Sequence, residues 1–351
     1  GKPEEVAMEF SLFLSCYFPD TSRASARVYA DMLEMAEAAE RLGYCGLTVP
    51  EHHFMNILMN PSPLMLAVKV AAVTKRIPIT CAVVVLPLND MRRTAGEVAL
   101  ADILSDGRIQ IGVGRGAFSY EFERYGVPFA DSREIFDESL DVLLALLTGE
   151  EVSWDGKYYK FAPLTIMPRP IQQPHPPIWI AALAPVAIYH CAKRGLNVQT
   201  TPLQGALELA QQQVDAFMKG AAESGLDPRP RLSLLRAGFC AESEAHAREK
   251  VAEAYDYYRR FDNVFKSPGT VRNGGIVPID IEASEADIAE ALFIGTPEQL
   301  IEKFQVYADL GVDEINLNMC IGASHAETLA SVERLAKEVM PHFSGKLRLT
   351  A

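Results

Sequence analysis

Apolar and amphipathic segments alternate along almost the whole chain. Short apolar runs rich in β-branched residues are typical of buried strands, and longer segments with an apolar residue every three or four positions are typical of helices. In the first half of the chain these patterns predict strands at 10–18, 45–49, 77–88 and 108–113 and helices at 26–42, 64–74, 92–104 and 133–147. From residue 178 onward they predict strands at 178–182, 198–200, 231–240 and 314–319 and helices at 185–194, 206–224, 245–261, 297–310 and 326–339.

This regular order of strand and helix predicts the fold class. A βαβα order favours a parallel sheet whose strands are connected by helices. The tally of strand–helix pairs predicts an α/β fold, a (β/α)8 TIM barrel whose typical length of about 250 residues is extended by insertions. A doubly wound sheet is the alternative. It would carry a glycine-rich phosphate fingerprint after its first strand, where this chain has Ser15-Cys16-Tyr17-Phe18-Pro19.

Two stretches interrupt the alternation. Residues 151–177 are interpreted as a hairpin around Asp155-Gly156 followed by a proline-rich connector. Residues 262–293 show neither a helical nor a strand period and are expected to be irregular. We therefore interpret 1–351 as a single barrel domain with insertions at about 151–177 and about 262–293.

Composition and charge narrow the class of function. The chain has 351 residues, 49% of them hydrophobic and 23% charged, as in ordinary soluble globular proteins. Its net charge of −13 argues against nucleic-acid binding, and no apolar stretch reaches the ~20 residues of a membrane span. Without a leader pattern, we expect a cytoplasmic protein that acts on neither nucleic acid nor membrane. The six cysteines are widely spaced, so small buried hydrophobes are expected rather than disulfides or zinc ligands.

The most unusual chemistry lies where two predicted strands end. Glu51-His52-His53 follows the second strand, and Arg115 lies between Gly114 and Gly116 after the fourth. Histidine titrates near neutral pH and suits proton transfer, arginine suits a phosphate or carboxylate, and glycines let the backbone approach a flat ligand. The carboxyl ends of all barrel strands meet at one rim. We therefore expect these groups to face one pocket.

Other interpretations of these residues stay open. Either His52 or His53 could be a loop residue bonded to the backbone, and Arg115 could be a surface arginine beside a tight turn. Glu51 could orient a histidine or pair with an arginine. Adjacent histidines rarely ligate one ion together, so we expect no metal site.

The motifs together resemble a known family. In chain order they are Glu51-His52-His53-Phe54 with Asn60-Pro61, Val84-Val85-Leu86-Pro87, Asp106-Gly107-Arg108, Gly112-Val113-Gly114-Arg115-Gly116, Tyr125-Gly126-Val127 and Gly295-Thr296-Pro297-Glu298. Over almost the whole chain they resemble the bacterial luciferase-like flavin-dependent monooxygenases, and in particular the luciferase α subunit. The resemblance implies a (β/α)8 barrel and an oxidoreductase that uses reduced FMN and O2.

The resemblance also implies roles for individual residues. His52 matches the catalytic histidine of the luciferases, with Glu51 and His53 beside it. Arg115 matches the arginine near the FMN phosphate, and Ala82-Val83 matches a non-prolyl cis peptide under the flavin ring. The chemistry implied is addition of O2 to the flavin C4a atom. The resulting (hydro)peroxyflavin would then oxygenate a small organic substrate, such as an aldehyde, a ketone or another apolar molecule.

The chain departs from this family pattern at the phosphate and ring contacts. Relatives often carry Ser or Thr at the start of the helix after the fifth strand, where this chain has Ala184, Val186 and Ala187. Backbone N–H groups there, with Arg115, are expected to hold the phosphate instead. Gly114 replaces a luciferase cysteine and is expected, with Gly116, to lie against the cofactor. We thus expect FMN to be bound loosely, or only in its reduced form as a substrate.

Three functions are compatible with the resemblance. The first is an FMN-dependent monooxygenase that receives reduced flavin from a separate flavin reductase, because the chain carries no nicotinamide fingerprint. The second is an F420-dependent oxidoreductase of the same superfamily, which would transfer hydride and ignore oxygen. The third is a non-catalytic flavin-binding or subunit-partner protein. The resemblance further implies a homodimer, with the second and third helices as candidate surfaces.

Overall fold

The structure, a computed structural model, describes residues 7–266 and 268–344. Among the described residues, its main sheet has nine strands. Strand β12 pairs only with the end of β9, and the other eight strands form a ring. The pairing of β8 with β9 closes that ring and confirms the predicted barrel. Round the barrel the strands are β1 (Glu9–Phe13), β2 (Leu47–Val49), β3 (Ile79–Val85), β4 (Ile109–Gly114), β7 (Ile178–Ala181), β8 (Asn197–Thr200), β9 (Leu232–Cys240) and β13 (Glu314–Asn318).

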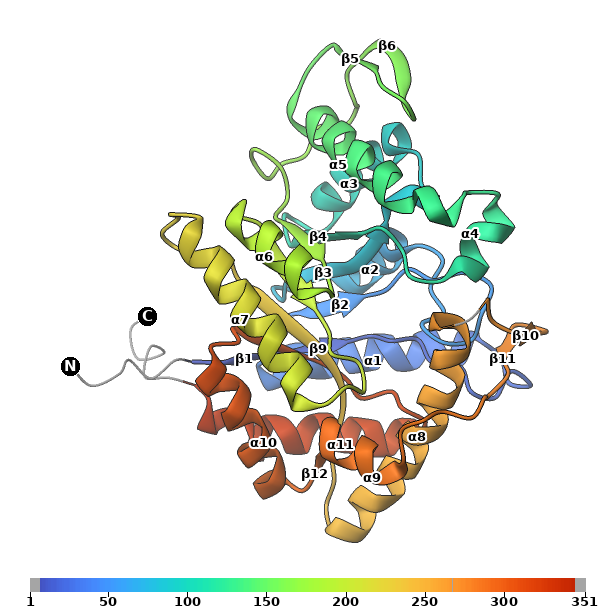
Figure 1. Cartoon of the computed structure of the whole chain (residues 1–351), viewed down its shortest axis with the longest axis vertical. Helices are drawn as coiled ribbons and strands as arrows, with labels where there is room; N and C mark the ends of the chain where they lie inside the picture. Colours follow the sequence, from blue (N-terminus) through green and yellow to red (C-terminus); the bar gives the residue numbers. More distant parts are fainter. Residues whose placement is uncertain (1–6, 267, 345–351) are drawn as a thin grey trace.

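Helices connect successive strands and surround the barrel (Figure 1). The longer helices are α1 (Ala26–Leu42), α2 (Pro63–Val73), α3 (Met91–Leu104), α5 (Ser132–Thr148), α6 (Pro185–Lys193), α7 (Leu207–Glu223), α8 (Glu244–Phe265), α10 (Pro297–Leu310) and α11 (His325–Glu338). The shorter elements are α4 (Ser119–Tyr125), α9 (Glu285–Ala291), β5 (Val152–Asp155), β6 (Lys160–Leu164), β10 (Val271–Arg272), β11 (Gly275–Ile276) and β12 (Phe293–Gly295), with 3₁₀ turns at Leu86–Leu88, Phe129–Asp131 and Met340–His342.

Several predicted elements have different ends. The first strand stops at Phe13 rather than at residue 18, and Cys16 has a φ of 53°, which extended backbone does not allow. In the stretch expected to be irregular, α8 continues to Phe265 and α9 starts at a Ser284–Asp287 capping box. Helix α4 was not expected, because two turns are too short to establish a helical period.

The barrel wall is held by apolar packing between strands and helices. Leu12, Ile79 and Ile111 of three strands are fully buried in one cluster with Met35 of α1 and Val98 of α3. Burial of each such side chain contributes roughly 1.5–3 kcal/mol. A second cluster at the mouth gathers aromatic side chains from the loops and α8; its members include Phe13, Tyr17, Phe118, Tyr257 and Phe261.

The segment between β9 and α10 is tied to the barrel by a buried arginine. Arg236 of β9 is 1% exposed and donates to the carbonyl oxygens of Leu203 and Ala291 and to the Tyr307 hydroxyl. Its guanidinium also lies over the Phe293 ring. These acceptors satisfy a cation that has no carboxylate partner among the described residues, and they fix the end of α9 against the barrel.

The cysteines follow the sequence expectation in the described structure. Cys16, Cys81 and Cys240 are buried, the other three are partly buried, and all six are free thiols. Burial raises the pKa of Cys320 to about 11, so this thiol stays protonated near neutral pH. Among the described residues, no helix combines the length and the apolar character needed to span a membrane.

A mostly buried ion pair joins α8 to α11. The Lys250 ammonium, 2% exposed, lies 2.9 Å from the Glu327 carboxylate, and His246 Nε2 lies 3.1 Å from the same oxygen. Glu327 also completes a capping box with Ser324 at the start of α11. The hydrogen bond from Lys250, together with those from His246 and the Ser324 backbone, lowers the pKa of Glu327 from 4.5 to about 2.

This depressed pKa predicts a specific loss of stability in acid. A carboxylate whose folded pKa lies below its unfolded value stabilises the fold above pH 4.5, and the stabilisation is lost as the pH falls toward 2. Because the Glu327 side chain is 38% exposed, screening limits the effect to about 1 kcal/mol or less. Glu327→Gln should lower the free energy of unfolding at pH 7, and its difference from wild type should shrink below pH 4.5 in urea titrations.

Glu333→Gln is the matched control, because it removes an exposed pair with Lys337 on the same helix. A Glu327→Gln difference from wild type that does not change with pH would show that the pair is not the cause.

Candidate active site

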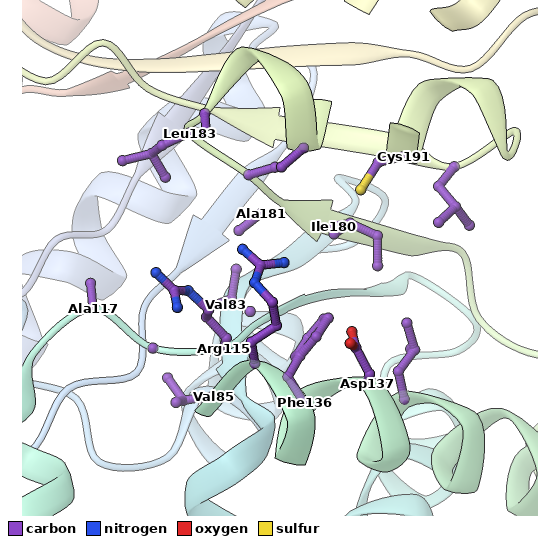
Figure 2. A pocket seen from close by; sticks show the side chains of 18 of the residues that line it. Val83, Val85, Arg115, Ala117, Phe136, Asp137, Ile180, Ala181, Leu183 and Cys191 are labelled. Atoms are coloured by element: carbon purple, nitrogen blue, oxygen red, sulfur yellow. The ribbon is translucent and has the colours of Figure 1, made fainter. Parts of the chain in front are cut away.

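A cavity of about 1010 Å3 opens at the carboxyl ends of neighbouring barrel strands (Figure 2). This volume is at the top of the range of roughly 300–1,000 Å3 found for small-molecule pockets. Its walls come from the loops after β2, β3, β4 and β7 and from the facing sides of α5 and α6. All but one of the predicted site residues line it: Glu51, His52, Ala82, Val83, Gly114, Arg115, Gly116, Ala184, Val186 and Ala187.

His52 is held by a buried carboxylate. Its Nδ1 lies 3.0 Å from Glu121 Oε1, the His53 backbone N–H donates to the same oxygen at 2.6 Å, and the imidazole stacks on Phe118. A carboxylate accepts but does not donate, so Nδ1 carries the proton and Nε2 of the neutral ring has a free lone pair. With a side chain 15% exposed and lining the cavity, His52 can accept a proton from a bound molecule.

Glu121 can accept a further hydrogen bond. It is fully buried on α4, and its second oxygen, Oε2, makes no hydrogen bond with any described residue. Buried carboxylate oxygens normally have partners, so the unpaired oxygen beside His52 makes Glu121 a candidate functional residue. The sequence analysis did not single out Glu121, because an acidic residue on a short helix gives no distinctive pattern.

His53 points away from the cavity into a separate network. Its Nε2 lies 2.7 Å from Glu51 Oε2, and its Nδ1 lies 2.9 Å from the Tyr125 hydroxyl. Burial, with the nearby charges of Glu51 and Glu121, raises the pKa of Tyr125, so the phenol stays protonated and donates. The structure therefore brings Glu51 and His52 to the cavity wall but places His53 behind it.

Polar contacts from neighbouring segments fix the loop that carries both histidines. The His52 backbone N–H donates to Asn60 O, and Asn60 Nδ2 donates to Pro50 O, so the loop folds back on itself. Glu51, 2% exposed, accepts from the Val85 backbone N–H and from Asn89 Nδ2. These contacts offset the cost of burying a carboxylate and hold the end of β2 against the end of β3.

The floor of the cavity is flat because its side chains are small. The Ala82–Val83 peptide bond is cis, and both residues face the cavity. A Cβ atom on Gly114 would lie 2.8 Å from Val83 Cγ2, so a side chain there would displace Val83 from the floor. Gly116 has a φ of 92°, and a Cβ atom on it would lie 2.5 Å from the Phe122 ring. A planar ring can therefore approach the backbone closely here.

Positive charge gathers beside this floor. Arg115 is exposed to the cavity and makes no ion pair with any residue that the structure describes. The first turn of α6 adds the backbone N–H groups of Val186 and Ala187, which follow Pro185 and have no partners within the helix. A helix N-terminus beside a free guanidinium is a suitable site for a phosphate.

Further cavity residues escaped the sequence analysis. Arg133, Asp137 and Asp141 lie four residues apart on α5, and His190 and Arg194 lie four apart on α6. This spacing puts each set on one helix face, which is a detectable signal. A solvated helix face has the same pattern, however, and only the tertiary structure shows that these two faces look toward each other.

Comparisons with known proteins agree with this geometry. The family model described as luciferase-like monooxygenase matches residues 8–314. The oxygenase component of a flavin-dependent trigonelline monooxygenase from Acinetobacter baylyi is 33% identical over 350 residues, which cover 96% of each chain. The alkanal monooxygenase alpha chain of the Kryptophanaron alfredi symbiont is 25% identical, over 97% of this chain and 99% of its own.

Solved structures with low sequence identity share the fold. The monooxygenase RslO1 from Streptomyces bottropensis has a TM-score of 0.84 at 24% identity, covering 96% of this chain and 100% of its own. The oxygenating constituent of 3,6-diketocamphane monooxygenase from Pseudomonas putida, solved with FMN, has a TM-score of 0.79 at 19% identity, covering 95% and 98%. An F420-dependent secondary alcohol dehydrogenase has a TM-score of 0.75 at 16% identity, covering 96% and 99%.

The family match extends from β1 to the start of β13, and it therefore includes every strand end that lines the cavity. The chain accordingly belongs to the luciferase-like monooxygenase family and is an oxidoreductase.

Proposed function

We propose that this protein uses reduced FMN and O2 to oxygenate a small organic substrate, with His52 as the catalytic proton carrier. One observation carries the proposal. The same cavity holds an imidazole whose Nδ1 is fixed by Glu121, a floor of small residues at Ala82–Val83, and the unpaired Arg115 with the start of α6. The imidazole provides for proton transfer, and the floor provides a surface for the flavin ring. Arg115 and the start of α6 provide for the flavin phosphate.

The floor suits the isoalloxazine ring. Small side chains at Ala82 and Ala181 and the absence of one at Gly114 leave a flat surface at the ends of β3, β4 and β7. His52 and Arg115 both line the cavity that this surface floors, and Arg115 lies close to Val83 (Figure 2). FMN would therefore lie with its ring toward His52 and its phosphate toward Arg115, Arg133 and the N–H groups of Val186 and Ala187.

His52 has the orientation that this role requires. Glu121 fixes the proton on Nδ1, so Nε2 can take a proton from a group in the cavity and return it later. Reduced FMN, when bound, supplies the oxygenation chemistry by reacting with O2 at its C4a atom. The chain contributes by holding the ring, moving protons at His52 Nε2 and keeping water away.

Water exclusion depends on the second insertion. Phe265, at the end of α8, lines the cavity and stacks with Phe261, and Phe118 packs between these rings and His52. We propose that 262–293 acts as the lid of the site. None of the residues of 151–177 lines the cavity, and Glu138 of α5 binds the tip of that hairpin instead.

The choice of a flavin rather than F420 has support beyond the geometry. The relative that is 33% identical is named as flavin-dependent and as an oxygenase component, which supports a separate flavin reductase for this chain also. The F420-dependent dehydrogenase shares 16% identity, which bears on the fold alone. We propose an aldehyde, a ketone or another small apolar molecule as the substrate class, since aromatic side chains surround His52 at the mouth.

A homodimer is part of the proposal. Met65 of α2 is 75% exposed, and Leu100 and Leu104 of α3 are 47% and 54% exposed. Leu100 and Leu104 lie one helical turn apart on one side of α3, so they present a continuous apolar strip. Exposed apolar strips on neighbouring helices are typical of subunit interfaces.

Arg115→Ala should weaken binding of reduced FMN at least about tenfold, or about 1.4 kcal/mol, the low end for a charged hydrogen bond. Anaerobic titration followed by flavin fluorescence gives the dissociation constant. Arg124→Ala is the control, because Arg124 stacks on Tyr120 and does not line the cavity. Equal dissociation constants for Arg115→Ala and wild type would exclude a phosphate contact.

His52→Ala should lower substrate-dependent oxygen uptake about a hundredfold or more while the dissociation constant of reduced FMN changes little. Oxygen-electrode assays with photoreduced FMN and a panel of small aldehydes and ketones measure this effect. His175→Ala, on a loop outside the cavity, should retain activity. Glu121→Gln should produce a smaller loss than His52→Ala, since it only positions the imidazole. Undiminished turnover in His52→Ala would refute the proton-transfer role.

Leu104→Arg should convert the proposed dimer to a monomer, because a charge in an apolar interface is costly to bury. Sedimentation velocity at micromolar concentration measures the mass. Leu226→Arg is the matched control, since Leu226 is 53% exposed on a different part of the surface. A wild-type protein that sediments as a monomer would contradict the interface.

A further inference from the structure

The cavity does not end at the phosphate position. It continues between α5 and α6 as an outer groove, formed by Phe136, Asp137, Leu140, Asp141, Cys191 and Arg194. Phe136 and Asp137 of α5 point toward Cys191 of α6 across this groove (Figure 2). None of these six residues is among those that we assign to the ring or to the phosphate of FMN, so this part of the cavity is available to a further part of a ligand.

The groove offers an apolar surface between charged edges. Phe136 and Leu140 lie one turn apart on α5 and face Cys191, and all three are buried or partly buried. Asp137 and Asp141 lie one turn apart beside them and are exposed. An aromatic and aliphatic surface suits a purine base, and paired carboxylates suit the hydroxyl groups of a ribose.

The guanidinium of Arg194 adds an unpaired positive charge to the groove. The Arg194 side chain lines the cavity and makes no hydrogen bond or ion pair with the residues described in the structure. Burial raises the pKa of the Cys191 thiol, Arg194 and Arg133 lower it, and Asp137 raises it further. The charges of Arg133, Arg194 and Asp137 therefore all act on the Cys191 thiol in this groove. Arg194 follows the last turn of α6, at the opposite end from the first phosphate position, and its free guanidinium suits a second phosphate.

We propose that the outer groove binds the adenosine monophosphate half of reduced FAD, so that the enzyme accepts reduced FAD as well as reduced FMN. This inference rests on the proposed function, because it assumes a flavin ring over Ala82–Val83. Arg194 pairs with the second phosphate, Asp137 and Asp141 accept hydrogen bonds from the ribose hydroxyls, and Phe136 contacts the adenine.

The charge of the groove favours this ligand over the acidic tail of F420. Asp137 and Asp141 would repel the carboxylates of an oligoglutamate tail, whereas they can accept hydrogen bonds from uncharged ribose hydroxyls. The volume agrees with a dinucleotide, because the combined cavity of about 1010 Å3 is at the top of the range for drug-sized ligands, roughly 300–1,000 Å3.

The test compares dissociation constants of reduced FAD and reduced FMN, measured anaerobically by flavin fluorescence with the full chain. For wild type we expect reduced FAD to bind as tightly as reduced FMN, within about threefold. Arg194→Gln should weaken reduced FAD about tenfold and change reduced FMN by less than about threefold. Lys193→Gln, which removes the same charge from the neighbouring residue that pairs with Glu223, should change neither.

The outcomes separate this inference from the proposed function. If reduced FMN binds and reduced FAD binds more than about tenfold more weakly, the inference is wrong and the proposed function stands. If Arg194→Gln weakens both flavins equally, Arg194 serves the first phosphate and the groove assignment is overturned. If wild type binds neither reduced flavin, the proposed function fails and this inference fails with it.

Discussion

Closure of the parallel barrel is the constraint on which the site depends. Each strand needs hydrogen-bonding partners on both edges, and the β8–β9 pairing satisfies the last two edges of the ring. Because all strands run the same way, their carboxyl ends must meet at one mouth. Residues far apart in the chain, from Glu51 to Val186, line one cavity for this reason.

Two buried carboxylates each bind one of the two adjacent histidines and give them different orientations. Glu121 holds His52 with its Nε2 free toward the cavity, and Glu51 draws His53 into a structural network with Tyr125. A carboxylate is costly to bury unless its oxygens are paired, and Glu51 is well satisfied by Val85 and Asn89. Glu121 keeps one oxygen without a partner among the described residues, next to the histidine that we propose as the proton carrier.

The phosphate side of the cavity relies on the backbone and on arginines. The first turn of α6 carries Ala184, Val186 and Ala187, so no hydroxyl adds to the N–H groups there. With fewer donors to the phosphate that we propose binds here, a flavin would be held less tightly than in a site with hydroxyl groups, which suits the proposed supply of reduced flavin by a separate reductase.

The sequence alone determined the barrel, the two strand ends with unusual residues, and ten of the residues that line the cavity. The apolar periods and the unusual residues that follow them are local patterns, and parallel topology converts them into one mouth. The tertiary structure decided which histidine faces the cavity, because that depends on Glu121 and Glu51, which approach from different segments. It also decided that Arg133, Asp137 and Arg194 belong to a groove, because charges spaced by four residues look the same on a solvated helix until a second helix faces them.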